Sequence, residues 1–173
     1  MNGGSIHVSI GDRTWRKPEL GWLKLNIDAA VFQDGQIGVG CVLRDAQGQF
    51  VGPRCQKVGG AWLPREAEAI SLNEALSWVI ERRYDHCIVE TDSKSFAMVC
   101  NGTPGEAFFG TIAVDCIQLL KHINPLVVQF AYRYANSVAH VLAKVAYSMS
   151  GLEVWYDDPP DFLIHALDSD IIY

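Results

Sequence analysis

Three acidic residues, Asp28, Glu68 and Asp92, are the best candidates for chemistry in this chain. Asp28 lies in the middle of the run WLKLNIDAAVF (residues 22–32), whose alternating apolar residues predict a strand. A carboxylate in mid-strand is unusual, because burying it is costly unless it is paired or bound to a cation. Asp28 therefore needs a partner elsewhere in the chain.

Glu68 and Asp92 are the residues that could join Asp28. Glu68 lies on the flank of the apolar stripe of a predicted helix over residues 64–83, and Asp92 ends the run VETDS. Each also has a purely structural interpretation: Asp92 could start a helix together with Ser93, and Glu68 could be a solvated residue of a first helical turn. Glu66 lies on the opposite flank of the stripe, and we interpret it as structural.

The three carboxylates can meet at one face of a sheet if the strands that carry Asp28 and Asp92 are neighbours. Carboxylates that share a site repel one another unless cations bind them, and hard oxygen ligands favour Mg²⁺ or Mn²⁺. Two such ions, about 3.5–4 Å apart, can stabilise an in-line phosphoryl displacement. The triad therefore predicts a metal site suited to phosphodiester chemistry.

The elements that must position these residues follow from periodicity and turn signals. Pro53 and Gly52 place the third strand at a sheet edge, and Asn136 or Ser137 can cap the last helix. The predicted strands span residues 22–32, 37–45, 50–58, 86–91 and 126–133, and the predicted helices span 64–83, 93–100, 106–123 and 136–150. Strands linked through helices pair in parallel by right-handed crossovers, so we expect a mixed α/β sheet with helices on both faces.

The length of 173 residues favours a single domain. We expect a flexible leader at residues 1–14, a folded domain at 15–150, and a tail at 151–173 that packs on the domain or trails it. The net charge of −6, without any basic run, means that binding to a polyanion must come from a local patch or from metal ions.

The sequence also restricts the compartment. No apolar run approaches the about 20 residues of a membrane span, which argues against a membrane partner. The N-terminus lacks the pattern of a signal peptide, and the five cysteines show no paired spacing. We therefore expect an intracellular protein that is not secreted, with reduced thiols that mostly fill the core.

The motifs IDAA, GVGCVLRD, AEAISLNEAL, VETDS and RYANSVAHVLAKVA follow one another in an order that resembles the ribonuclease H-like family. The chain looks most like plant ribonuclease H-type domains related to those of non-LTR retroelement reverse transcriptases, and the resemblance covers about residues 15–150. It implies a five-stranded mixed sheet in the order 3-2-1-4-5. It also implies hydrolysis of the RNA strand of RNA/DNA hybrids with Mg²⁺ or Mn²⁺, normally two ions.

The resemblance assigns Asp28, Glu68 and Asp92 to catalytic, metal-binding positions. The family's last carboxylate is an aspartate in a pattern like N-x-x-A-D, whereas here Asn136-Ser137-Val138-Ala139 is followed by His140. His140 could bind a metal, act as an acid or base, or be an inert replacement. Arg133 and Asn136 are expected near the site, where a strand-end charge and a helix cap are their simplest interpretations.

Two functions remain open from the sequence. The first is a metal-dependent endonuclease in which Asp28, Glu68 and Asp92 hold the ions and His140 completes the site. The second is a nucleic-acid-binding or adaptor module that keeps the fold and has lost efficient cleavage, which the acidic charge balance and His140 favour. The sequence does not determine the oligomeric state.

Overall fold

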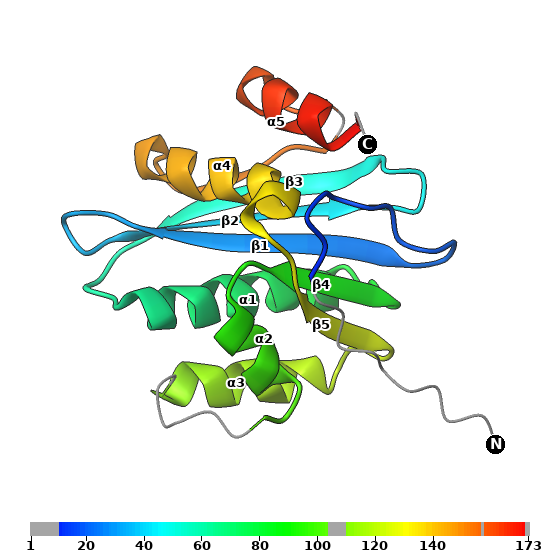
Figure 1. Cartoon of the computed structure of the whole chain (residues 1–173). Coiled ribbons are helices and arrows are strands. Elements are labelled where there is room, and N and C mark those ends of the chain that lie inside the picture. The colour runs from blue at the N-terminus through cyan, green and yellow to red at the C-terminus, as the bar shows by residue number, and fades with distance from the viewer. Residues whose placement is uncertain (1–10, 104–109, 157, 172–173) are drawn as a thin grey trace.

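The structure is a computed structural model that describes residues 11–103, 110–156 and 158–171. The first ten residues of the expected leader and the start of the helix expected at 106–123 lie outside the described residues. Figure 1 shows a central sheet with helices on both of its faces, as the sequence predicts.

The sheet has six strands, ordered β5-β4-β1-β2-β3-β6. Their bounds are β1 Leu23–Val31, β2 Ile37–Arg44, β3 Phe50–Val58, β4 Cys87–Thr91, β5 Leu126–Phe130 and β6 Leu152–Val154. The pairs β1–β2, β2–β3 and β3–β6 are antiparallel, and β1–β4 and β4–β5 are parallel. This is the expected order 3-2-1-4-5 with one strand added from the tail.

Two expected boundaries in the sheet are corrected. The third strand is not a free edge throughout, because β6 pairs with Arg54, Cys55 and Gln56 just beyond Pro53. The fifth strand ends at Phe130 rather than at residue 133, and a short 3₁₀ helix, η1 (Arg133–Asn136), follows it. This early end of the strand places Arg133 in a turn rather than in the sheet.

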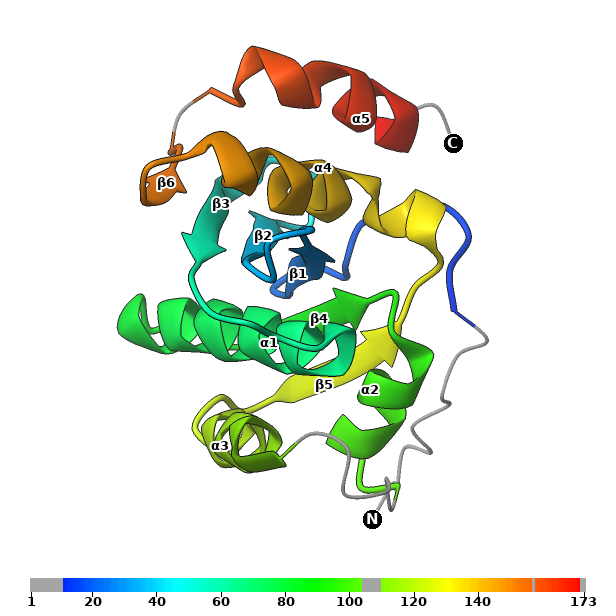
Figure 2. The ribbon, with the colours of Figure 1, turned by 90° about the vertical axis from the view of Figure 1, so that its left-hand side faces the viewer.

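The helices lie on the two sides of the sheet, as Figure 2 shows: α1 (Pro64–Glu81), α2 (Lys94–Cys100) and α3 (Gly110–Leu120) on one side, and α4 (Ser137–Val145) and α5 (Asp161–Ile171) on the other. Helix α1 covers one face, with α2 and α3 packed beyond it. Helix α4 covers the other face and continues into η2 (Ala146–Ser148), and α5, formed by the tail, packs on α4. Among the described residues, no helix is both long enough and apolar enough to span a membrane.

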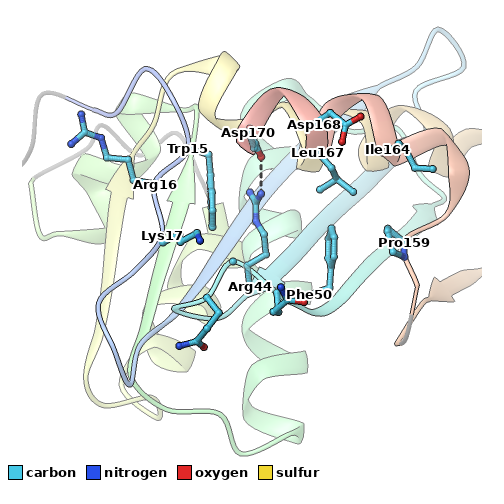
Figure 3. A pocket seen from close by; sticks show the side chains of 13 residues that line it. Trp15, Arg16, Lys17, Arg44, Phe50, Pro159, Ile164, Leu167, Asp168 and Asp170 are labelled. Atoms are coloured by element: carbon cyan, nitrogen blue, oxygen red, sulfur yellow. Dashed lines mark hydrogen bonds and ion pairs between the residues drawn. The ribbon is translucent and has the colours of Figure 1, made fainter. Parts of the chain in front are cut away.

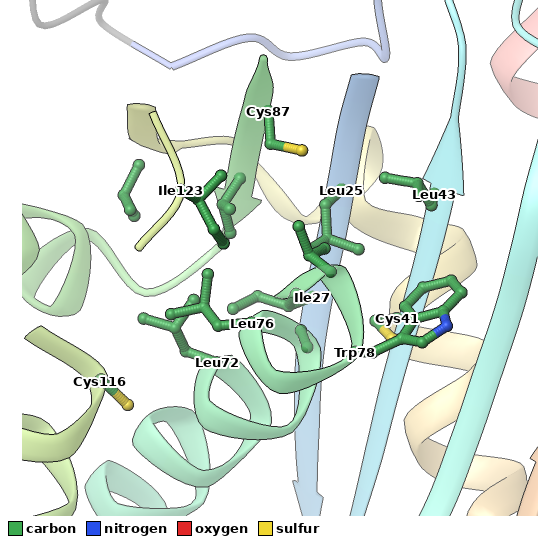
Figure 4. Close-up of a cluster of buried hydrophobic side chains, with 14 of the residues drawn as sticks. Leu25, Ile27, Cys41, Leu43, Leu72, Leu76, Trp78, Cys87, Cys116 and Ile123 are labelled. Carbon is green, nitrogen blue, oxygen red and sulfur yellow. The ribbon is translucent and has the colours of Figure 1, made fainter. Parts of the chain in front are cut away.

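A large apolar core fills the space between α1 and the sheet (Figure 4). The predicted stripe of α1 contributes to it as expected, with Leu72, Leu76 and Val79 fully buried against Leu25 and Ile27 of β1. Four of the five cysteines are buried thiols, namely Cys41, Cys55, Cys87 and Cys116, and none of the five forms a disulfide. The apolar alternation of the first strand therefore does face a core.

On the opposite face, α4 lies very close to β2. An added Cβ at Gly40 would collide with the backbone N of Ala143 and the carbonyl O of Ala139, and one at Gly38 would collide with the carbonyl O of Ala143. Only glycine leaves room for this approach. The two glycines therefore allow α4 to lie directly on the strand next to the one that carries Asp28.

The polar side of the first strand is buried, although alternation alone would expose it to solvent. Lys24, Asn26 and Asp28 are only 3%, 0% and 0% exposed, because α4 and η1 cover them. The Nζ of Lys24 pairs with Oε1 of Glu90 at 2.8 Å, and the Nδ2 of Asn26 donates to Oε2 of Glu90 at 2.9 Å. Buried polar groups need hydrogen-bond or ion-pair partners, and Lys24 and Asn26 both find theirs in Glu90 of the adjacent strand β4.

Arg44 connects this buried network to Trp15, near the start of the described residues, and to Asp170, near their end. Its Nη1 pairs with Oδ2 of Asp170 in α5 at 2.6 Å, and its Nη2 donates to Oδ1 of Asn26 at 3.2 Å. The guanidinium stacks 3.6 Å from the ring centroid of Trp15, whose Nε1 also donates to Asn26. Figure 3 shows Arg44 between Trp15 and Phe50, at a cavity of about 610 Å³. None of Asp28, Glu68 or Asp92 lines this cavity.

Candidate active site

The candidate site forms where the parallel pairing of β1 and β4 stops. The last paired residues are Ile27 and Thr91, so Asp28 and Asp92 are the next residue on each strand. Asp28 is fully buried, with Gly40 of β2 as its neighbour on the other side. The end of the ladder therefore brings Asp28, within β1, next to Asp92, the first residue of the bend that follows β4.

Glu68 reaches the aspartates from α1. One oxygen from each of Asp28, Glu68 and Asp92 lies within 4.8 Å of the others. Glu68 also accepts a 3.4 Å hydrogen bond from Oγ1 of Thr91, the last residue of β4. The carboxylates thus converge, as the sequence indicates, just beyond the end of the β1–β4 ladder.

Of the purely structural roles that the sequence allows for the acidic residues, the structure shows the one for Glu66 but not the one for Asp92. Glu66 accepts a 2.8 Å hydrogen bond from the backbone N–H of Leu63, so it caps the start of α1, in agreement with its structural interpretation. Asp92 is not a helix cap, because Ser93 occupies the N-cap position of α2 and the backbone N–H of Ser93 donates to Thr91. Asp92 is therefore free of the structural role that its sequence context suggests.

Crowding changes the acidity of the cluster. Burial, followed by the negative charges of Asp28 and Asp92, raises the pKa of Glu68 from its ordinary 4.5 to about 8. Burial and Asp28 likewise raise the pKa of Asp92, while Arg133 opposes that shift. Without a cation, Glu68 consequently holds a proton at neutral pH.

Arg133 is the main positive charge at the cluster. Its Nε lies 2.5 Å from Oδ2 of Asp92, and its Nη1 lies 3.8 Å from Oδ2 of Asp28. The 3₁₀ turn η1 places it there, whereas a continued strand would have left it as an ordinary strand-end charge. Sequence reasoning put Arg133 near the site but missed this ion pair.

His140 contacts Asp28 rather than a cluster of all three acids. Its Nδ1 lies 2.6 Å from Oδ2 of Asp28, and its Nε2 lies 3.1 Å from Nη1 of Arg133. Nη1 of Arg133 also lies 2.5 Å from Nδ1 of His140, so the imidazole is held between Asp28 and Arg133. In the metal-free protein His140 and Arg133 together stabilise the carboxylate of Asp28.

Asn136 has a role that a helix-cap interpretation does not predict. Its side chain makes no capping bond to α4; instead Nδ2 donates to the backbone O of Ile27 at 2.8 Å, and Oδ1 accepts from Asn26 at 3.1 Å. Asn136 therefore fixes the start of α4 against the strand residue that precedes Asp28. Asn26, a polar residue between Leu25 and Ile27 of the predicted strand, is the sequence signal that could have indicated this pairing.

The residues fit a divalent cation. The Oδ1 of Asp28 is buried and has no hydrogen-bond partner among the described residues, which is costly unless a cation or water binds it. The three converging oxygens, with the pKa of Glu68 raised by burial and by the neighbouring charges, form a donor set that a shared cation would stabilise. Asp28, Glu68 and Asp92 are thus the residues that could hold Mg²⁺ or Mn²⁺.

Comparison with known proteins gives consistent matches. The family model described as "Reverse transcriptase-like" matches residues 26–146. A protein of Arabidopsis thaliana named as a ribonuclease H is 27% identical over 160 residues, covering 91% of this chain; the chain spans only 26% of that relative.

Solved structures share the fold at low sequence identity. Ribonuclease H1 of the archaeon Halobacterium salinarum has a TM-score of 0.67 at 22% identity, covering 73% of this chain and 97% of the archaeal chain. LC11 ribonuclease H1, in complex with an RNA/DNA hybrid, has a TM-score of 0.64 at 19% identity and covers 73% of this chain and 96% of its own.

Proposed function

Because the chain belongs to the reverse transcriptase-like family, we propose that it is a metal-dependent ribonuclease H-type endonuclease that hydrolyses the RNA strand of RNA/DNA hybrids. The products would carry a 3′-hydroxyl and a 5′-phosphate. The convergence of Asp28, Glu68 and Asp92, with one oxygen of each within 4.8 Å of the others, is the observation that carries the proposal. A divalent ion bound there would polarise the scissile phosphate and acidify the attacking water.

The protein groups around the site have distinct roles in this proposal. Asp28 supplies a buried, unpartnered oxygen that favours ion binding. Glu68, whose pKa is about 8 without a cation, must lose its proton when an ion binds, so ion binding releases protons below that pH. Arg133 must shift from Asp92 to admit an ion, and its charge is then free to contact a phosphate of the substrate.

His140 limits activity in Mg²⁺ in this proposal. It stands where the family pattern has an aspartate, and its Nδ1 binds Asp28 instead of adding an anionic oxygen to the cluster. Mg²⁺ strongly prefers oxygen ligands in octahedral geometry, whereas Mn²⁺ accepts imidazole more readily. We therefore expect weak cleavage in Mg²⁺ and stronger cleavage in Mn²⁺.

The test compares the wild type with His140→Asp on a labelled RNA/DNA hybrid in each metal. His140→Asp restores an oxygen ligand on a helix that already contacts Asp28, so it should raise the initial rate in Mg²⁺ by about tenfold or more. Asp28→Asn is the negative control for contaminating nuclease. If the wild type is already fully active in Mg²⁺ and His140→Asp adds nothing, His140 is a working catalytic residue and the proposed impairment is wrong.

A second candidate function is a nucleic-acid-binding module that does not cleave. Arg133 pairs with Asp92 and Asp28 and His140 contacts Asp28, so part of the negative charge of the cluster is balanced without any ion, and these contacts favour the second function. Absence of cleavage by both proteins in both metals, together with hybrid binding in EDTA, would support this alternative over the nuclease.

A further inference from the structure

Two arginines and two tyrosines come together beside the carboxylates of this acidic protein. The segment that precedes β1 runs next to the chain that leaves β5, through a parallel bridge between Asp12 and Ala131. The backbone N–H of Tyr132 donates to the carbonyl O of Asp12 at 2.9 Å. This pairing brings Arg13 to the stretch Tyr132-Arg133-Tyr134, although the two segments are more than a hundred residues apart in sequence. We call these four residues the arginine–tyrosine surface.

One side of the arginine–tyrosine surface is held by contacts to Tyr132, and the other side, at Tyr134, is exposed to solvent. The guanidinium of Arg13 lies 5.4 Å from the ring centroid of Tyr132, and the ring of Phe130 packs edge-on against Tyr132 at 5.0 Å. Tyr134, two residues further on, is 85% exposed, which is exceptional for so large an aromatic side chain in this protein. A fixed aromatic ring under a cation, next to an open aromatic ring, is a typical surface for nucleotides.

The position of this surface relative to the carboxylates decides what it can contact. Arg133 binds Asp92 through Nε, and Tyr134 is its immediate neighbour in the chain. Consecutive Cα atoms are about 3.8 Å apart, so the Cα of Tyr134 lies at that distance from the Cα of Arg133, whose side chain contacts Asp92. A nucleic acid bound at the carboxylates would therefore pass close to the backbone of Tyr134.

We propose that the arginine–tyrosine surface binds unpaired nucleotides that flank the hybrid, with Tyr134 stacking on a base and Arg13 contacting a phosphate. Bases inside a duplex already stack on their neighbours, so an open tyrosine ring gains most from an unpaired base. Arginines supply the charge that phosphates require and that the chain as a whole, at −6, lacks. The substrate class is thus a hybrid with a single-stranded extension; the inference rests on the proposed function for the hybrid part only.

The test is equilibrium binding by fluorescence anisotropy in EDTA, which prevents cleavage. The probes are a blunt hybrid, the same hybrid with an extension of about six nucleotides on either strand, and the extension alone as RNA or as DNA. We expect the extension to tighten binding by about tenfold, since stacking on one aromatic ring accounts for that order of affinity. The RNA and DNA arms determine which strand is held.

Substitutions test whether the expected gain in affinity for the extended hybrid comes from the arginine–tyrosine surface. Tyr134→Ala should remove most of the advantage of the extended hybrid over the blunt hybrid, and Tyr134→Phe should retain it, because the ring and not the hydroxyl stacks. Arg13→Gln should reduce the slope of log affinity against log salt by about 0.7, the value for one phosphate contact on a single strand. Tyr156→Ala, at an exposed tyrosine beside Arg82 at the far end of α1, is the matched control and should change nothing.

The outcomes separate this inference from the proposed nuclease activity. Equal affinity for blunt and extended hybrids, or an advantage that survives in Tyr134→Ala, would overturn the arginine–tyrosine surface even if the wild type cleaves blunt hybrid. Binding of the extension that depends on Tyr134, in a protein that cleaves no hybrid in Mg²⁺ or Mn²⁺, would retain the surface and refute the nuclease.

Discussion

Replacing Glu68 with glutamine should stabilise the metal-free protein at high pH and leave it nearly unchanged at low pH. In the folded chain the pKa of Glu68 is about 8, raised from an ordinary 4.5 by burial and by the two aspartates. The folded protein therefore binds this proton more tightly than the unfolded chain does. The stability of the wild type consequently falls as the pH rises from about 4.5 to about 8.

The magnitude follows from the pKa difference. Each pH unit between the two pKa values costs about 1.4 kcal/mol, so three units, from about pH 5 to about pH 8, cost at most about 4 kcal/mol. Glu68 is only partly buried, and solvent screening reduces this to about 2 kcal/mol. Glutamine keeps the size of the side chain and an oxygen that can accept from Thr91, but it has no charge to repel Asp28 and Asp92.

The assay is urea unfolding in EDTA, followed by circular dichroism, for both proteins at about pH 5 and about pH 8. The free energies of unfolding should agree at the lower pH, and Glu68→Gln should be more stable by about 2 kcal/mol at the higher pH. Glu66→Gln removes a carboxylate from the same helix away from the cluster, and it should not reproduce this gain. If the gain in stability of Glu68→Gln over the wild type is no larger at the higher pH than at the lower, Glu68 does not share a crowded site with the aspartates.

Three further substitutions test other parts of the structure. Asp28→Asn should abolish cleavage but shift the melting temperature in EDTA by only a few degrees, because relief of repulsion offsets the lost ion pairs; a large drop would mean that Asp28 is structural. Gly40→Ala should lower the free energy of unfolding by about 2 kcal/mol or more in urea titrations, since the new methyl collides with the backbone of α4, and a neutral result would refute that close contact. Asn26→Leu should cost about 2–4 kcal/mol in the same assay because it leaves buried partners such as Glu90 unpaired, and unchanged stability would mean that the buried network contributes little.

The sequence identified the catalytic carboxyl candidates for a physical reason. A charged residue in the middle of a strand, as at Asp28, requires a partner, and the two other acids stand at ends of predicted elements. Their meeting point was harder to place, because it depends on where the β1–β4 pairing stops. That end is set by long-range register, between Ile27 and Thr91, which no local pattern encodes.

Other features were beyond local patterns. The alternation places Lys24 and Asn26 on the polar side of the first strand, but it does not show that Glu90 and Asn136, far away in the sequence, pair with them in the interior. The ion pair of Arg133 depends on a strand that ends three residues earlier than its alternation indicates. The three-residue strand β6 is too short to show any periodicity, so the tail gave no signal that it would extend the sheet.

The buried guanidinium of Arg44 has a consequence for how far this domain can be trimmed. Its stacking partner, Trp15, precedes the first strand, and its counter-ion, Asp170, lies in the last helix. A chain cut back to β1–β5 and α1–α4 would keep every carboxylate of the cluster but would lose both the stacking partner and the counter-ion of Arg44. Breaking such a pair costs about 3–5 kcal/mol, a large part of the about 5–15 kcal/mol that holds a typical domain together. We therefore expect the smallest part of this chain that folds stably to extend at least from Trp15 to Asp170.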